Sequence, residues 1–345
     1  MVNVMSRVLV NGCGRIGRCV IRNLWERGIA ECVAINEPGM EIDNIVYLLK
    51  FDTIYGRFDG NVENVGNDLI RISNNEKAWN LRVYRSKTLM SDDEYIKDCP
   101  DIIVEASGRE DCARASWKCI DSGVQHVIIT NTFFDADFTY VMGHNDEEFD
   151  MNKHKVISTS ICDANATIPL ISALSKINNI DYCFVTTLHP WLSYQNLMDA
   201  PVRMQRREGE TSDYYPLGRA SAESLIPKTT TLGPVLLRMF PNLKKRLSYF
   251  SYRTPTQIVA SADMSFILEK EMSKEKIIDI FSACGENIVN INKDDIVSID
   301  CRKMTHSSIV DTRWLQVDGN KLKVITWYDN EWGYSSRVID LINKL

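Results

Sequence analysis

The chain has 345 residues, 44% of them hydrophobic and 25% charged, which favours about two globular domains. Its formal net charge of −6 argues against nucleic acid and anionic membranes as partners, and no apolar run approaches the roughly 18 residues that cross a bilayer. The ten cysteines include no CxxC pair and no zinc-like Cys/His spacing, so we expect free thiols in a reducing cytoplasm and no metal site.

The first predicted unit is a strand–helix–strand passage. An apolar strand at residues 8–10 leads into a glycine-rich turn and an amphipathic helix, and a second apolar strand follows at residues 32–35. The turn contains Asn11, Gly12, Gly14, Arg15, Ile16 and Gly17. Such glycines let the backbone approach a pyrophosphate at the helix N-terminus, and Glu37, 20 residues after Gly17, can accept hydrogen bonds from the adenosine ribose. Because a carboxylate there repels a 2′-phosphate, the pattern predicts NAD.

The same alternation continues along the first half of the chain. Residues 102–108 begin as an apolar strand and end in small residues, a helical segment covers residues 113–120, and a further strand covers residues 127–129. These repeats predict an α/β fold, a doubly wound Rossmann-type parallel sheet with the cofactor across the carboxyl ends of its strands. Ser107, Gly108 and Thr130 would then line the cofactor groove, although plain loop positions remain an equal alternative.

A candidate nucleophile lies where a strand ends and a helix begins. The β-branched pair at residues 156–157 leads into small polar residues, and a helix-like apolar pattern follows Cys162. Backbone N–H groups and the helix dipole favour an anion there, so we expect a lowered thiol pKa. His189 ends a strand-like run beyond that helix and is the candidate base. The alternative is that Cys162 is a buried small apolar residue.

The second half of the chain favours an α+β domain with a mainly antiparallel sheet. Strand-like runs cover residues 183–188, 248–252, 258–267, 296–299 and 322–327. A helix at 274–282 interrupts them, and the chain ends in an amphipathic helix. We therefore predict an NAD-binding domain of residues 1–161, completed by a helix at 330–345, and a catalytic domain of residues 162–329.

These motifs resemble those of the phosphorylating glyceraldehyde-3-phosphate dehydrogenases and of their erythrose-4-phosphate dehydrogenase relatives, over nearly the whole chain. The matching segments are residues 11–18, 34–38, 162–165, 186–189, 253–256, 305–308 and 327–335. The last of them, Trp-Tyr-Asp-Asn-Glu-Trp-Gly-Tyr-Ser, is the most specific. The resemblance implies a homotetramer that uses NAD to oxidise a small phosphorylated aldehyde, with no nucleic acid or membrane partner.

The resemblance also implies roles for individual residues. Cys162 corresponds to the nucleophile that forms a thiohemiacetal and then a thioester, and His189 corresponds to its base. Asn330 matches the residue that orients the nicotinamide carboxamide. Arg15 and Ile16 match backbone contacts to the pyrophosphate, and Glu37 stands where the family usually has Asp. The positions that match phosphate-binding residues are Thr230, Thr231 and Arg253.

Four departures from the family pattern concern anion binding. Ile161 stands where phosphate-using relatives have a Ser, Thr231 where they have a Gly, Leu192 where they have a Thr, and Asp163 where a Thr follows the nucleophile. Each lost hydrogen bond costs on the order of 1–3 kcal/mol. The charge of Asp163 would also disfavour a thiolate.

Three functions stay open at this point. The first is oxidation of glyceraldehyde 3-phosphate through Cys162 and His189, with phosphate releasing the thioester. The second is a non-phosphorylating enzyme in which water releases it, acting on erythrose 4-phosphate or another pathway-specific aldehyde. The third is a catalytically silent NAD-binding paralogue, which the presence of Cys162, His189 and Asn330 together argues against.

Overall fold

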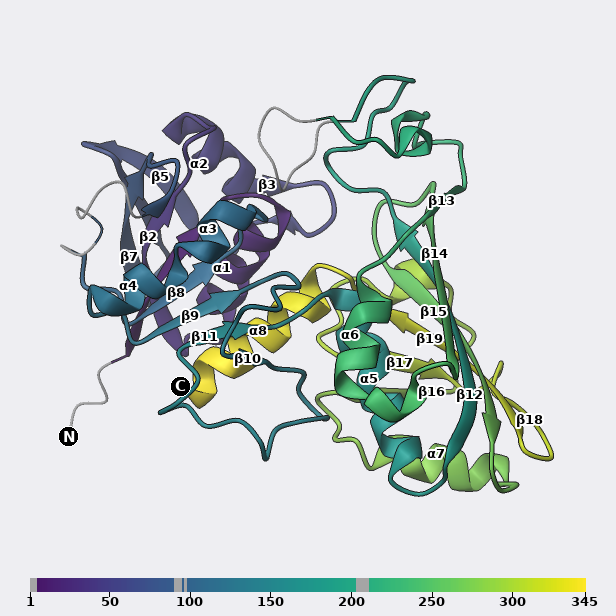
Figure 1. Cartoon of the computed structure of the whole chain (residues 1–345). Helices are drawn as coiled ribbons and strands as arrows, with labels where there is room; N and C mark the ends of the chain where they lie inside the picture. Colours follow the sequence, from purple (N-terminus) through teal and green to yellow (C-terminus); the bar gives the residue numbers. More distant parts are fainter. Residues whose placement is uncertain (1–4, 90–94, 96–97, 203–210) are drawn as a thin grey trace. The chain divides into compact units, whose positions relative to one another are not determined.

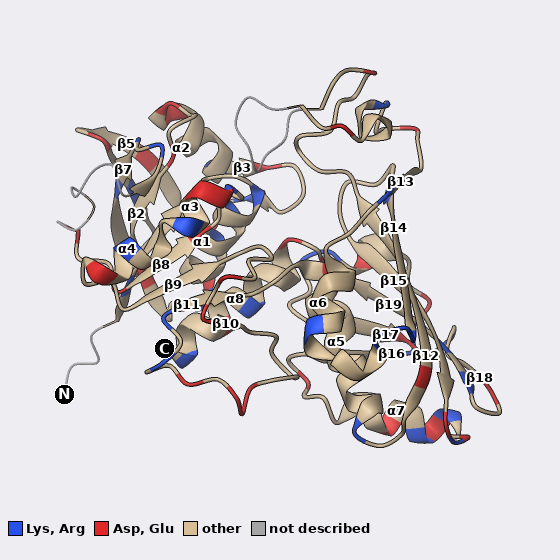
Figure 2. Cartoon of the chain, in the orientation of Figure 1, with Lys and Arg blue, Asp and Glu red and all other residues tan. Residues whose placement is uncertain are grey.

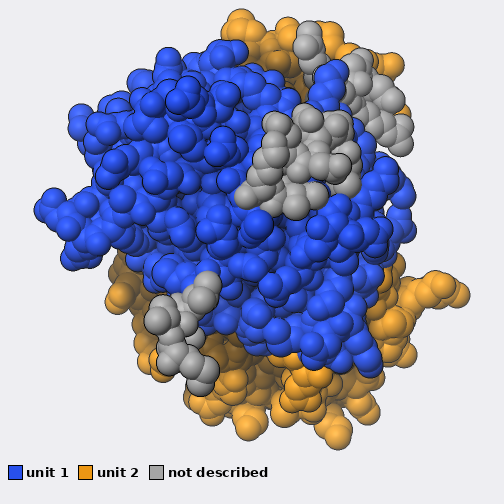
Figure 3. Space-filling view, turned by 90° about the vertical axis from the view of Figure 1, so that its left-hand side faces the viewer, with its two compact units in different colours: residues 1–140, 149–159, 335–345 blue, residues 141–148, 160–334 orange. Residues whose placement is uncertain are grey.

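A computed structural model describes residues 5–89, 95, 98–202 and 211–345 of the chain (Figure 1). These residues form two compact units, coloured in Figure 3. Unit 1 comprises Met1–Tyr140, Phe149–Thr159 and Ser335–Leu345. Unit 2 comprises Val141–Glu148 and Ser160–Tyr334. Each unit therefore draws on more than one stretch of sequence.

Unit 1 is built on a nine-stranded sheet with the strand order β10-β11-β9-β8-β1-β2-β7-β6-β5. The strands are β1 (Ser6–Asn11), β2 (Ala30–Asn36), β5 (Asn61–Gly66), β6 (Leu69–Ser73), β7 (Ala78–Tyr84), β8 (Ile102–Glu105), β9 (His126–Ile129), β10 (Phe138–Thr139) and β11 (Val156–Ser158). From β10 to β7 neighbouring strands pair in parallel, and β6 and β5 extend β7 as an antiparallel meander. The predicted doubly wound parallel sheet is confirmed.

Helices connect the parallel strands of unit 1, as crossovers between parallel strands require. They are α1 (Arg15–Arg27), α2 (Ile42–Lys50), α3 (Glu110–Arg114) and α4 (Ser116–Asp121), and a small β3 (Phe51–Asp52) and β4 (Gly56–Arg57) ribbon follows α2. The larger part of the last helix of the chain, α8 (Trp332–Lys344), also belongs to unit 1. Helix α1 buries Val20, Ile21 and Leu24 and ends at Gly28, whose φ of 62° is the left-handed conformation that glycine adopts most readily. The first strand and helix thereby hold the glycine-rich turn between them.

Unit 2 contains a mixed, mainly antiparallel sheet with the order β13-β14-β12-β15-β19-β17-β16, and β18 pairs with β19. The strands are β12 (Ile180–Pro190), β13 (Ile226–Lys228), β14 (Leu247–Thr254), β15 (Ala260–Leu268), β16 (Val289–Asn292), β17 (Ser308–Asp311), β18 (Gln316–Asp318) and β19 (Lys321–Tyr328). The helices are α5 (Cys162–Ser175), α6 (Leu232–Met239), α7 (Lys274–Ser282) and the short 3-10 turns η3 (Tyr215–Gly218), η4 (Pro241–Leu243) and η5 (Ser298–Cys301). Apolar side chains of α5, α6, α7 and the sheet form one continuous core.

One predicted strand of unit 2 is wrong. Residues 296–299 form no strand, and η5 begins within them. Val297 and Ile299 are 62% and 49% exposed, because they lie in a surface turn and not in a strand of the sheet. The strand lies earlier, at β16, where Val289 is buried and Ile291 packs against the core. A short apolar run alone could not separate these two outcomes.

Charged residues of both signs are interspersed along the ribbons of the two units (Figure 2). Within the described ranges, no helix is both long and apolar enough to cross a membrane.

Candidate active site

In unit 1, three glycines shape the turn between β1 and α1. Gly12 has a φ of +97°, and a Cβ on it would lie 2.7 Å from the backbone of Ser107. A Cβ on Gly17 would lie 1.9 Å from the carbonyl oxygen of Gly12, so helix and strand approach closely there. By contrast, no described atom lies within 4 Å of a Cβ placed on Gly14. The turn is tight on one side and open at the helix N-terminus, which fits a bound pyrophosphate.

Glu37 and Arg15 both help to hold this turn. The carboxylate of Glu37 accepts hydrogen bonds from the backbone N–H of Cys13 (2.9 Å) and of Gly39 (2.9 Å), and its remaining lone pairs stay available to ribose hydroxyls. The Arg15 guanidinium pairs with Asp52 at 2.5 and 3.3 Å. Arg15 therefore contributes its backbone, not its charge, to the open helix N-terminus.

Glu105, at the end of β8, is a buried carboxyl group that the sequence analysis missed. It accepts hydrogen bonds from the side chain of Asn11 and from both the backbone N–H (2.8 Å) and the hydroxyl of Ser107. Its own backbone carbonyl accepts 3.0 Å bonds from the N–H and the hydroxyl of Thr130. Burial raises the pKa of Glu105 to about 7. Asn11, Ser107 and Thr130, three of the predicted cofactor-binding residues, are thus all hydrogen-bonded to Glu105. The sequence feature that could have identified Glu105 is a carboxylate at the end of an apolar strand.

In unit 2, the backbone changes direction sharply before the nucleophile. Ser160 has a φ of +58°, Ile161 is extended, and Cys162 is the first residue of α5. Ile161 gives no side-chain cap to the helix. Instead, the Asn165 side chain donates a 3.0 Å hydrogen bond to the carbonyl of Ile161. The backbone N–H of Asn165 donates to the same carbonyl at 3.1 Å, so the backbone and the side chain of the Asn in Cys-x-x-Asn both close the turn that carries Cys162.

Helix α5 contains a proline in its interior. Pro169 has no N–H, so the carbonyl of Asn165 receives no helical hydrogen bond from it. The Thr167 hydroxyl donates a 2.8 Å bond to the carbonyl of Asp163 within the same turn. Side-chain hydrogen bonds therefore support the first turn, while apolar packing supports the remainder of the helix.

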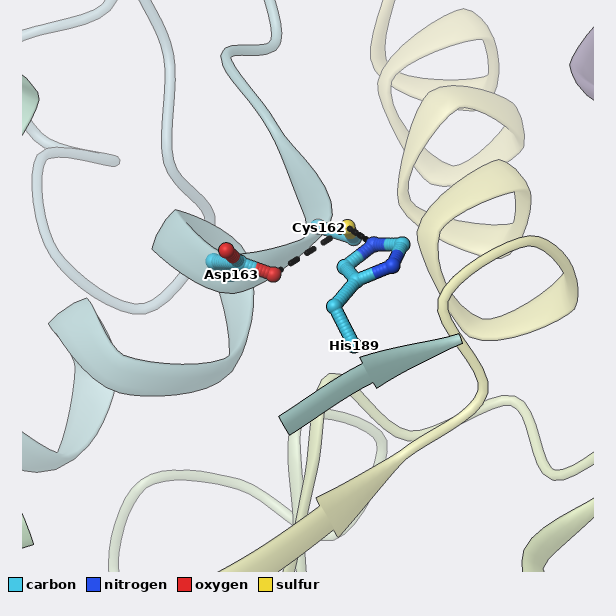
Figure 4. Close-up of side chains that lie close together, drawn as sticks. All are labelled: Cys162, Asp163 and His189. Atoms are coloured by element: carbon cyan, nitrogen blue, oxygen red, sulfur yellow. Dashed lines mark hydrogen bonds between the residues drawn. The ribbon is translucent and has the colours of Figure 1, made fainter. Parts of the chain in front are cut away.

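Cys162 and His189 face each other across the contact between α5 and β12 (Figure 4). The distance from Cys162 Sγ to His189 Nε2 is 3.4 Å. His189 Nδ1 lies 2.8 Å from the carbonyl oxygen of Pro190, which can only accept, so Nδ1 carries the proton of a neutral imidazole. Nε2 then presents its lone pair to the thiol, which is the arrangement of a nucleophile with its general base.

Asp163 completes a group of three polar side chains. Its Oδ1 lies 3.5 Å from Cys162 Sγ and accepts a 2.8 Å hydrogen bond from the hydroxyl of Tyr328 at the end of β19. Its Oδ2 accepts a 3.3 Å bond from Thr187, whose hydroxyl oxygen also lies 2.9 Å from the hydroxyl of Ser251. Two strands therefore fix the carboxylate next to the sulfur. Neither Tyr328 nor Thr187 was assigned this role from the sequence, because the contacts join distant segments.

The electrostatics of this group contradict one prediction. Burial raises the pKa of the Cys162 thiol well above its usual value, and the charge of Asp163 acts in the same direction. Burial lowers the pKa of His189 to about 3, and the charge of Arg253 also lowers it. The resting pair is therefore a neutral thiol and a neutral imidazole. The expectation of a lowered thiol pKa was wrong because burial and an adjacent carboxylate outweigh the helix dipole.

Asp163 itself stays ionised. Burial acts to raise its pKa, but its neighbours outweigh burial and place the carboxyl pKa below its ordinary value. Those neighbours are His189, Lys228, Tyr328 and Arg253. Asp163 therefore places a negative charge beside the sulfur, which a site formed by a Cys and a His alone would lack.

Two cations lie near the group because of strand pairing. In the parallel β12–β14 ladder, His189 is paired with Arg253, whose buried guanidinium donates to the Tyr194 hydroxyl at 3.3 Å. The Nε of Arg253 has no partner among the described residues. Lys228, on β13, is paired with Ser251 and lowers the pKa of Asp163. Lys228 was not a predicted site residue. The feature of the sequence that could have identified it is a single cation immediately before Thr229-Thr230-Thr231.

Comparison with known proteins agrees with this geometry along the whole chain. Residues 6–111 match the family model described as glyceraldehyde 3-phosphate dehydrogenase, NAD binding domain, and residues 161–330 match that of the C-terminal domain. A glyceraldehyde-3-phosphate dehydrogenase of Kitasatospora aureofaciens is 32% identical over 99% of both chains. Glyceraldehyde-3-phosphate dehydrogenase 2 of Bacillus subtilis is 33% identical over 98% of this chain and 96% of its own.

The chain belongs to the glyceraldehyde-3-phosphate dehydrogenase family. It is accordingly an NAD-dependent oxidoreductase, and both the resemblance and the predicted cofactor are confirmed. The open turn at Gly14 fits the cofactor's pyrophosphate. In unit 2, Asn330 is only 5% exposed, and its Oδ1 has no hydrogen-bond partner among the described residues, which fits an acceptor for the nicotinamide carboxamide.

The residues that depart from the family pattern have definite surroundings. Ile161 packs against the apolar core of unit 2 and offers no donor. Thr230 accepts a 3.2 Å hydrogen bond from the N–H of Leu232, and Thr231 is the N-cap of α6. Leu192, in place of a hydroxyl, offers no side-chain donor; its backbone N–H donates to the Gln195 side chain at 3.0 Å. Of the predicted phosphate positions, Arg253 is the cation, and Thr230 and Thr231 offer one hydroxyl each.

Proposed function

We propose that this member of the family oxidises a small phosphorylated aldehyde, glyceraldehyde 3-phosphate in the first instance, through a covalent bond to Cys162. The observation that carries the proposal is the 3.4 Å contact between Cys162 Sγ and the unprotonated Nε2 of His189. This geometry supports attack by sulfur with simultaneous proton removal.

The residues act in two steps. As Cys162 Sγ bonds to the aldehyde carbon, His189 Nε2 takes the thiol proton and delivers it to the former carbonyl oxygen, giving a thiohemiacetal. His189 then removes that hydroxyl proton while a hydride leaves the same carbon, and the product is a thioester on Cys162. NAD supplies the hydride acceptor when bound. Because the thiol pKa is raised, sulfur attack and proton transfer have to be concerted.

The cations of the site support a phosphorylated substrate. Arg253 is buried with an Nε donor to spare, and Lys228 lies beside the same pair of strands. Two positive charges next to a catalytic thiol attract an anionic aldehyde, and the planar guanidinium suits a phosphate group.

A second candidate is release of the thioester by water, and Asp163 favours it. A carboxylate beside the sulfur repels inorganic phosphate: two unit charges about 5 Å apart repel by about 3 kcal/mol at an effective dielectric constant of 20. Asp163 Oδ1 lies 3.5 Å from the sulfur, where it can accept a hydrogen bond from a water molecule that attacks the thioester. Ile161 adds no phosphate donor.

NADH formation tests both candidates. The purified protein is incubated with NAD and either glyceraldehyde 3-phosphate or erythrose 4-phosphate, with and without inorganic phosphate. Phosphate-dependent turnover of the triose supports the first candidate, and turnover that ignores phosphate supports hydrolysis. Cys162→Ser is the control that should abolish turnover with either aldehyde. If neither aldehyde yields NADH and iodoacetamide does not modify Cys162, the chain is a silent NAD-binding paralogue.

A triple variant tests the reason for any phosphate independence. Ile161→Ser, Asp163→Thr and Thr231→Gly together restore the residue types of phosphate-using relatives. The two hydroxyls that Ile161→Ser and Asp163→Thr introduce, at about 1–3 kcal/mol each, should lower the KM for phosphate by about 30-fold or more. If the folded triple variant has the same phosphate dependence as the parent, then Ile161, Asp163 and Thr231 are not the cause of the phosphate independence.

We also infer a cytoplasmic homotetramer. The described residues contain no disulfide, which supports a reducing compartment, and full-length similarity to the family supports its usual assembly. Light scattering on the purified protein measures the assembly directly, and a monomer would contradict the inference.

A further inference from the structure

Cys162, Asp163 and His189 bring together three kinds of metal-binding atom. A sulfur, a carboxylate oxygen and an imidazole nitrogen all lie within 4.8 Å of one another, and the described residues contain no other such group of three. The sequence showed no zinc-like spacing because the ligands come from the first turn of α5 and from the end of β12. Figure 4 shows the three side chains converging on one small volume.

Two of the three separations match those of a metal-bound set. The distance from Cys162 Sγ to His189 Nε2 is 3.4 Å, and that from Sγ to Asp163 Oδ1 is 3.5 Å. In a tetrahedral zinc site with bonds of about 2.3 Å to sulfur and about 2.0 Å to nitrogen or oxygen, the sulfur lies about 3.5 Å from either atom. The Asp163–His189 edge is the longer one, within 4.8 Å, so these two ligands have to approach each other when a metal binds.

Hydrogen bonds already orient the ligand atoms. His189 Nδ1 donates to the Pro190 carbonyl at 2.8 Å, which leaves Nε2 unprotonated and pointed at the sulfur. Tyr328 and Thr187 donate to the two oxygens of Asp163. Metal-ligating histidines and carboxylates in proteins have such outer partners, which fix the tautomer and the orientation of the ligand. The tautomer of His189 and the place of the Asp163 carboxylate beside the sulfur are thus set without any metal.

We propose that Cys162, Asp163 and His189 reversibly bind a borderline-soft divalent cation such as Zn²⁺, with a fourth position left to water. On binding, the Cys162 thiol gives its proton to solvent and the sulfur bonds to the metal as a thiolate. The thiolate and the carboxylate together balance the charge of the cation. The bound metal removes the sulfur from aldehyde chemistry; this inhibitory part rests on the proposed function, whereas the binding part does not.

The surroundings favour reversible binding over a permanent structural site. Arg253 and Lys228 lie close enough to lower the pKa of Asp163, and their positive charges oppose a cation. Only three protein ligands converge, whereas structural zinc sites have four. A chelator should therefore strip the metal without unfolding the protein.

The carboxylate of Asp163 distinguishes the proposed metal site from the family pattern. At this position the family pattern has a Thr, which is a far weaker ligand for a divalent cation than a carboxylate. Asp163→Thr therefore keeps the thiol and the imidazole but removes one ligand. Asp163→Asn is the isosteric variant that keeps a side chain able to bond with Tyr328 and Thr187.

The binding experiment uses Co²⁺ as a spectroscopic probe of the full-length protein, without NAD or aldehyde. A Cys99→Ser background removes an exposed thiol that could bind metal on its own. We expect one equivalent of Co²⁺ to produce a thiolate-to-cobalt charge-transfer band in the near ultraviolet, which Zn²⁺ displaces. Cys162→Ser should abolish the band, and Asp163→Thr and Asp163→Asn should weaken binding by at least about 10–100-fold, the loss expected even for an outer partner.

Each outcome decides the proposal. Absence of the band, a band that survives Cys162→Ser, or unchanged affinity in both Asp163 variants would overturn it. Zn²⁺ should also stop NADH formation in the parent protein, and a chelator should restore it. Full turnover with metal bound would overturn the inhibitory part. A metal site with the expected ligand dependence in a protein that oxidises neither aldehyde would instead refute the proposed function and leave the binding proposal intact.

Discussion

Replacing Asp163 by Thr should lower the pKa of the Cys162 thiol. The carboxylate oxygen lies 3.5 Å from the sulfur, and the pKa of Asp163 lies below its ordinary value, so the group is charged at neutral pH. Two unit charges at that distance repel by about 1.2 kcal/mol in water and by about 5 kcal/mol at an effective dielectric constant of 20. Since one pKa unit corresponds to about 1.4 kcal/mol, the variant thiol should titrate about 1 to 3 units lower.

The pH dependence of alkylation measures this shift. In a Cys99→Ser background, the rate at which iodoacetamide modifies Cys162 is followed by intact mass between neutral and alkaline pH. The parent rate should still be rising above pH 9, because the thiol pKa lies well above its ordinary value of 9.0. In Asp163→Thr the rise should come at lower pH. Leu192→Thr, which restores another family hydroxyl without changing charge, is the matched control and should leave the profile unchanged. Coincident profiles for the parent and Asp163→Thr would refute the electrostatic reasoning.

Three further predictions concern the base, the cofactor turn and a buried acid. His189→Ala should lower kcat/KM for the aldehyde by about 10²–10⁴-fold, the usual contribution of a general base, while NAD affinity measured by calorimetry stays the same. Gly17→Ala places a Cβ 1.9 Å from the Gly12 carbonyl oxygen and should destabilise the protein by about 1–3 kcal/mol in urea, whereas Gly14→Ala, which meets no described atom within 4 Å, should weaken NAD binding without lowering stability. Burial raises the pKa of Glu105 from an ordinary value of 4.5 to about 7, so folding favours its protonated form, and stability should fall as pH rises through that window. Urea unfolding at pH 4.5 and 7 should show the parent losing about 3 kcal/mol relative to Glu105→Gln, and parallel pH profiles would contradict the assigned pKa.

The sequence was most informative where function depends on neighbouring residues. The glycine turn between β1 and α1 was predictable because its spacing, its flanking strand and its helix are all local. Cys162 was correctly expected at the start of a helix, and His189 at the end of a strand, from the change in apolar period around each. Their 3.4 Å contact followed from the strand–helix–strand order.

What the sequence could not supply depends on contacts between distant segments. Tyr328 donates to Asp163 across 165 positions, and no local pattern encodes that bond. Lys228 comes near the carboxylate only through the β13–β14 register. The direction of the Cys162 pKa shift was wrong because burial depends on packing, which a helix-dipole argument ignores. Residues 296–299 were misread for the same reason, since apolar residues can lie in an exposed turn.

Pro169 has a mechanical consequence for the helix that carries the nucleophile. Pro169 has no N–H to donate to the carbonyl of Asn165, so one backbone hydrogen bond is missing between the turn that carries Cys162 and the rest of α5. The bonds that brace this turn come from Asn165 and Thr167, which both act inside it. The turn that carries Cys162 is therefore coupled less tightly to the rest of α5 than an unbroken helix would allow, while the apolar residues beyond Pro169 pack in the core.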